Sequence, residues 1–65
     1  MQASNLPKVG NSLQISIVSE NGKKAATVTK FKSVNEWLLT YSSNGNMSYF
    51  PNYAAIVTHL QKAGW

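Results

Sequence analysis

The chain has 65 residues and a formal net charge of +4, with six lysines, two glutamates and no arginine. A chain of this length forms one domain at most, so residues 1–65 are predicted to be a single small domain. It has no cysteine and one histidine, which excludes disulfides, thiol catalysis and zinc sites with several ligands. No run approaches the ~20 apolar residues of a membrane span, and the first residues lack the apolar core of a secretory signal. These features favour a soluble, cytoplasmic protein.

A β-hairpin is predicted over residues 12–32, after a loop or flexible start at residues 1–11. Apolar and polar residues alternate on both sides of Asn21-Gly22. This dipeptide is typical of a two-residue type I′ turn, in which both residues have φ > 0. The predicted register pairs Glu20 with Lys23, Val18 with Ala25, Ile17 with Ala26, Ser16 with Thr27, Ile15 with Val28, and Leu13 with Lys30.

The predicted hairpin has one apolar face and one mainly polar face. The apolar face comprises Leu13, Ile15, Ile17, Ala26 and Val28. The other face comprises Gln14, Ser16, Val18, Ala25, Thr27, Thr29 and Phe31. Because a two-stranded ribbon is not stable alone in water, the rest of the chain must cover the apolar face.

A helix is predicted over residues 33–44. Ser33 and Glu36 have the spacing of a capping box at its start, and Ser42-Ser43-Asn44-Gly45 is suited to its end. The residues that share one face of this helix, at the spacing of an amphipathic helix, are Val34, Trp37, Leu38 and Tyr41. Leu39 projects from the opposite, polar side, which makes it a candidate for contact with a partner.

A second helix is predicted over residues 50–63, after a connection at residues 46–50. Pro51 is favourable near a helix start. Gly64 is suited to the C-terminal cap, with Trp65 folding back as its hydrophobic contact. The residues that form the apolar stripe of this helix are Tyr53, Ile56, Val57, Leu60 and Ala63.

The predicted fold class is therefore α+β, a two-layer ββαα arrangement in which two helices cover an antiparallel β-hairpin. Catalysis is not expected, because the only carboxylates are Glu20 and Glu36, both with structural roles, and His59 stands alone. The four glycines are scattered singly and form no phosphate-binding loop. We expect no cofactor and no metal.

Contact with another protein is the favoured function: an inhibitor, an adaptor or a regulatory subunit of a larger macromolecule, with self-association included. Aromatic residues and methionine are common in interface hot spots. The candidate protein-binding residues are Leu39, Tyr41, Met47, Tyr49 and Phe50. The alternative interpretation of the aromatic residues is that they fill the junction between helices and sheet.

The alternative function is nucleic-acid binding through a lysine-rich hairpin. Lysines attract phosphates, and an exposed aromatic ring can stack on a base. The lack of arginine argues against sequence-specific readout. The candidate nucleic-acid-binding residues are Lys8, Lys23, Lys24, Lys30, Lys32 and Phe31. Lysines that only keep the protein soluble are equally compatible with the pattern.

Overall fold

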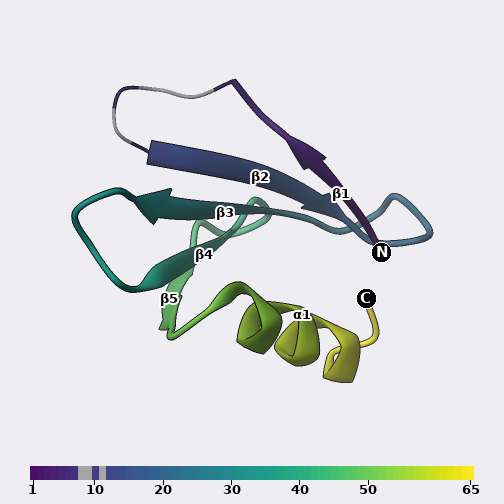
Figure 1. The fold of residues 1–65 in the computed structure, drawn as a ribbon. Coiled ribbons are helices and arrows are strands. Elements are labelled where there is room, and N and C mark those ends of the chain that lie inside the picture. Colours follow the sequence, from purple (N-terminus) through teal and green to yellow (C-terminus); the bar gives the residue numbers. More distant parts are fainter. Residues whose placement is uncertain (8–9, 11) are drawn as a thin grey trace.

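The computed structural model of the chain describes residues 1–7, 10 and 12–65. Five strands form one antiparallel sheet in the order in which they occur in the sequence, and one helix follows them (Figure 1). The strands are β1 (Gln2–Asn5), β2 (Ser12–Val18), β3 (Ala25–Phe31), β4 (Trp37–Tyr41) and β5 (Met47–Phe50). The helix is α1 (Tyr53–Lys62).

The predicted ββαα fold is wrong, because the structure has five strands and a single C-terminal helix. Residues 33–44, predicted to be a helix, contain a turn and strand β4 instead. Residues 46–50, predicted to be a connection, contain β5. The expected loop at residues 1–11 includes the short strand β1, while residues 8, 9 and 11 lie outside the described part of the chain.

The hairpin at residues 12–32 is confirmed, and its register is the predicted one. Ile17 pairs with Ala26 and Ile15 with Val28, and these side chains lie on the face that packs against the helix. Alternation of apolar and polar residues fixes this register, because a slip of one residue would turn every apolar side chain towards water.

The turn of this hairpin differs from the predicted type I′ turn. Gly22 has φ 72°, and none of the described non-glycine residues has a positive φ, Asn21 included. The Ser19 amide donates to the Lys24 carbonyl at 2.9 Å, which closes a loop of residues 20–23. The Asn21 Oδ1 atom accepts hydrogen bonds from the Lys23 amide (2.9 Å) and the Ser19 hydroxyl (2.7 Å). The side chain of Asn21 therefore stabilises the turn, although its backbone does not adopt the left-handed conformation.

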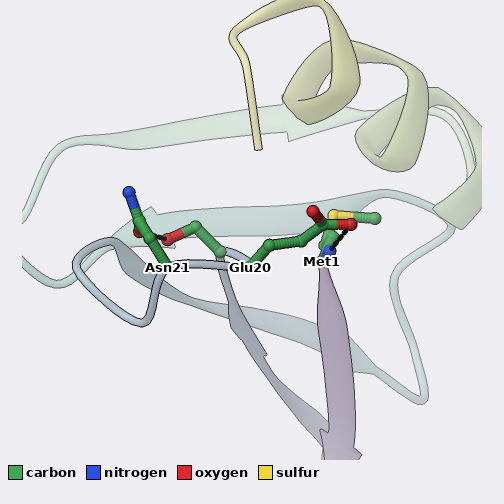
Figure 2. Close-up of polar contacts among 4 residues, drawn as sticks. Met1, Glu20 and Asn21 are labelled. Carbon is green, nitrogen blue, oxygen red and sulfur yellow. Dashed lines mark hydrogen bonds and ion pairs between the residues drawn. The ribbon is translucent and has the colours of Figure 1, made fainter.

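Strand β1 brings the start of the chain to this turn. The amino group of Met1 lies 3.4 Å from a carboxylate oxygen of Glu20, as Figure 2 shows. Glu20 was expected to face Lys23 across the turn, and its ion pair is with Met1 instead. Because the Glu20 side chain is 86% exposed, this pair contributes little to stability.

The period of the 37–41 segment explains why the helix prediction is wrong. Trp37, Leu39 and Tyr41 point towards α1, whereas Leu38 and Thr40 occupy the opposite face, as expected for a strand. Leu39, which did not fit the helical pattern, is 0% exposed. Tryptophan, tyrosine and threonine also favour strands. Ser42-Ser43-Asn44-Gly45 forms the turn to β5, where the Gly45 amide donates to the Tyr41 carbonyl at 2.8 Å.

Helix α1 covers one face of the sheet, and the core lies between the two. The fully buried apolar residues are Ile17, Ala26, Val28, Leu39, Ile56 and Leu60. The helix begins after Asn52, whose side chain accepts a hydrogen bond from the Ala55 amide at 2.8 Å. This N-cap explains why α1 starts later than the predicted position 50, since Phe50 already belongs to β5.

The predicted C-terminal cap is confirmed. Gly64 has φ 87°, its amide donates to the Gln61 carbonyl, and the Trp65 amide donates to the Leu60 carbonyl. This pair of bonds is the Schellman motif. Trp65 packs against the core beside Tyr41, and their ring centroids are 6.0 Å apart. At the other end of α1, the ring centroids of Trp37 and Tyr53 are 5.7 Å apart.

Gly22→Val is expected to lower the free energy of unfolding by about 1 kcal/mol or more, because a β-branched residue resists positive φ. A Cβ atom at Gly22 would meet nothing within 4 Å, so backbone strain is the only source of this effect. Gly22→Asn, which tolerates the left-handed region, is the control. Denaturant unfolding should rank wild type, Asn and Val in falling stability, and equal values for Val and Asn would contradict the assigned turn.

Leu39→Ala is expected to cost roughly 2–5 kcal/mol of stability, because it removes a fully buried side chain. Leu38→Ala, on the other face of the same strand, should cost clearly less because Leu38 is only partly buried. Thermal unfolding followed by circular dichroism measures both. A larger loss for Leu38 than for Leu39 would favour the helical period over the strand.

Candidate protein-contact surface

The face of the sheet opposite α1, here called the open face, carries the main exposed apolar side chains. Phe31 of β3 is 45% exposed, and Met47 and Tyr49 of β5 are 65% and 64% exposed. Side chains alternate along each strand, so these residues point away from the core residues Val28 and Leu39. The described part of the chain has one helix, and it lies on the other side of the sheet (Figure 1).

Strand register brings these three side chains together with Leu38 in one area of the open face, here called the open-face patch. Tyr49 is directly opposite Leu38 of β4. Leu38 is opposite Thr29, two residues before Phe31 on β3, so Phe31 and Leu38 are diagonal neighbours. Such neighbours are ~7–8 Å apart, within reach of aromatic side chains. The patch comprises Phe31, Leu38, Met47 and Tyr49.

Hydrogen-bonding side chains surround the open-face patch. Thr27 and Thr40 face each other across β3 and β4, and Thr40 is opposite Met47. Gln14 and Ser16 continue the polar rows on β2. Many protein interfaces have apolar side chains at the centre and hydrogen-bonding side chains around them.

The structure separates the five candidate protein-binding residues. Met47 and Tyr49 lie on the open face, but Leu39 lies in the core at 0% exposure, so its expected exposure is wrong. Tyr41 and Phe50 pack partly buried against the core. The Tyr41 hydroxyl lies 2.9 Å from Nε2 of His59, and the Phe50 and His59 rings are 5.2 Å apart. Tyr41 and Phe50 therefore join helix to sheet.

Leu38 was not among the candidates from the sequence. In a helix it falls on the buried face, and only the strand period places it on the open face. The poor fit of Leu39 to the helical pattern is the signal that could have revealed Leu38. A strand period places Leu39 in the core and Leu38 on the open face, the reverse of the helical period.

The candidate nucleic-acid-binding lysines do not form one patch. Lys23 and Lys24 are exposed in the turn between β2 and β3, whereas Lys30 and Lys32 lie at the opposite end of β3. A seven-residue strand such as β3 spans roughly 20 Å at its usual rise per residue. Lys30 donates hydrogen bonds to the carbonyls of Phe31 and Val34, so its ammonium group is engaged within its own loop. Lys8 lies outside the described residues.

A long segment in the second half of the chain lacks charged side chains. Between Glu36 and Lys62 the sequence contains no Asp, Glu, Lys or Arg. This stretch forms β4, β5 and all of α1 except its last residue. Soluble globular domains have ~25% charged residues, so a sheet edge without charges and a helix whose only lysine is its last residue, Lys62, depart from the usual composition.

The described residues offer little for other kinds of site. No group of three or more His, Asp or Glu side chains among them could hold a metal ion. None of their helices is both long and apolar enough to cross a membrane. The two glutamates lie in separate turns, Glu20 between β2 and β3 and Glu36 between β3 and β4. Comparison of the chain with protein-family models, curated proteins and solved structures gave no match.

The separation of the lysines leads to a prediction about DNA binding. If only one lysine pair contacts phosphates at a time, log K against log salt for duplex DNA should have a slope of about −2. A slope of about −5 would require nearly all six lysines to act together, and would contradict the separation described above. Fluorescence anisotropy with a labelled duplex over a salt series measures this slope, and Lys23→Glu/Lys24→Glu identifies the pair.

Proposed function

We propose that the protein is a small, non-enzymatic binding module that acts in the cytoplasm by contact with another protein, as an inhibitor, an adaptor or a regulatory subunit. The observation that carries this proposal is the open-face patch. It exposes Phe31, Met47 and Tyr49 on a sheet face whose strand residues carry no charge. Exposed aromatic and methionine side chains at the centre of an uncharged surface are typical of interface anchors.

The chemistry of the open face indicates the kind of partner. It offers apolar side chains together with threonine hydroxyls and the Gln14 amide. A matching surface would itself be apolar and rich in hydrogen-bonding groups, because a strongly charged partner would lose hydration without gaining a counter-charge. Nucleic acid is the weaker alternative, since its phosphates would find no strand lysine on this face.

The absence of cysteine supports a reducing compartment such as the cytoplasm. The non-enzymatic part of the proposal is supported by the distribution of titratable side chains. Glu20 and Glu36 are exposed in different turns, and His59 binds the Tyr41 hydroxyl. Paired acid and base groups, which most hydrolytic and transfer reactions need, are not assembled by these residues.

Substitutions on the open face test the proposal. The immobilised protein is exposed to a lysate with and without nuclease treatment, at low salt and at about 0.5 M salt, where surface electrostatics are largely screened. A protein partner should be retained at both salt concentrations and lost with Phe31→Lys/Tyr49→Lys. The double variant should keep the wild-type melting temperature, because both side chains are exposed.

The matched control is Ser33→Lys/Ser43→Lys, which adds the same charge at exposed turn positions off the strands. It should retain the partner. Equal retention by the open-face variant and the control would contradict the proposal. Binding that disappears with nuclease or with salt would favour the nucleic-acid alternative.

A further inference from the structure

Strand β5 forms one edge of the sheet, and its register shows which backbone groups point outwards. The Tyr41 amide donates to the Asn46 carbonyl at 2.9 Å, so this pair is hydrogen-bonded. In an antiparallel ladder, hydrogen-bonded and non-hydrogen-bonded pairs alternate. Ser48 and Phe50 therefore bond to β4, while Met47 and Tyr49 direct their N–H and C=O groups away from the sheet. None of the described strands lies beyond β5.

This edge lacks the usual protection against pairing. Exposed edge strands commonly carry lysine, proline or a bulge that prevents addition of another strand. The sequence of β5 is Met-Ser-Tyr-Phe, with no charge and no proline. Its short length and Pro51, which directly follows it, limit the edge to a few residues. The edge also belongs to the charge-free stretch between Glu36 and Lys62.

We propose that β5 pairs antiparallel with β5 of a second copy of this chain, about a two-fold axis that passes beside Ser48. In this register Met47 faces the partner's Tyr49, and Tyr49 faces the partner's Met47. The outward N–H and C=O groups of both residues are then satisfied across the axis. The result is one continuous sheet that runs through both copies.

The second copy fits this edge because the edge is complementary to itself. Met47 and Tyr49 direct their backbone groups outwards on either side of Ser48. A two-fold axis beside Ser48 therefore places the outward groups of one copy opposite those of the other. Each methionine sulfur would lie beside a tyrosine ring, a favourable contact, and both side chains are exposed in the single chain. The opposite edge, β1, exposes Ala3 and Asn5 by the same reasoning, and these small or polar side chains add little contact area.

Charge also selects this edge. Each copy carries a formal net charge of +4, so two copies repel each other through most orientations. Pairing through β5 brings together surfaces built from residues without charge. Lys30 lies on β3, two strands from β5, and Lys23 and Lys24 lie in the turn that precedes β3. Lys62 is at the end of α1 remote from β5. Separations beyond ~8 Å are largely screened at physiological salt.

Ser48 provides a charge-swap test. It would face the partner's Ser48 as a non-hydrogen-bonded pair, with Cα atoms roughly 4.5 Å apart, and it is exposed in the single chain. Ser48→Lys and Ser48→Glu should each weaken self-association roughly fivefold or more through like-charge repulsion. An equimolar mixture of the two variants should restore it as a heterodimer. Sedimentation equilibrium over a concentration series measures all three samples.

The control is Ser4→Lys, the same change at the centre of the β1 edge, which should leave the dimer intact. Three results would each overturn the proposal: a monomer mass for the wild type up to about 1 mM, a dimer insensitive to both Ser48 variants, or a mixture that does not reassociate. Restoration by mixing also shows that the variants are folded.

This dimer goes beyond the proposed function, and the two can fail separately. Ser48 pairs with Leu39 of β4, so its side chain lies on the side of the sheet that faces α1 and not on the open face. A monomeric Ser48→Lys variant that still captures the partner would retain the function without the dimer. A wild-type dimer that captures no protein would leave the dimer without the function.

Discussion

The docking of α1 on the sheet is the interaction on which the rest of the structure depends. Ile56 and Leu60 are 0% exposed and meet the inner side chains of the central strands, among them Val28 and Leu39. Full burial of a leucine or isoleucine contributes roughly 1.5–3 kcal/mol, a large share of the stability of so small a domain. A single ten-residue helix can cover only one face of a five-stranded sheet. The open face is therefore a direct consequence of how the core is built.

The register of the first hairpin could be predicted from the sequence, although its turn could not. A two-residue loop and a four-residue loop centred between Asn21 and Gly22 pair the same strand residues, so an incorrect turn left the register unchanged. The turn conformation depends on the Asn21 side chain, which accepts bonds from Ser19 and Lys23. Local dipeptide preference does not include those contacts. The C-terminal cap was predictable because Gly64 and Trp65 act within one helical turn.

The segment from residue 33 to residue 50 was mispredicted because two periods fit it. Trp37, Leu38 and Tyr41 satisfy a helix, while Trp37, Leu39 and Tyr41 satisfy a strand. The neighbouring strand β3 decides between them, since pairing with its Thr27, Val28 and Thr29 requires the strand. This decision also determines the candidate site. Composition predicts Met47 and Tyr49 as candidate contact residues, and both lie on the open face, whereas Leu38 becomes a candidate only when the sheet is complete.

The positions of the two tryptophans make the docking of the helix observable by fluorescence. Trp37 lies against Tyr53 at the first residue of α1, and Trp65 lies against Tyr41 just beyond its last. Both indoles are partly shielded from water only while the helix rests on the sheet. Release of α1 would therefore shift the emission of both to longer wavelength. Replacing either one by phenylalanine would leave a single intrinsic reporter for one end of the helix.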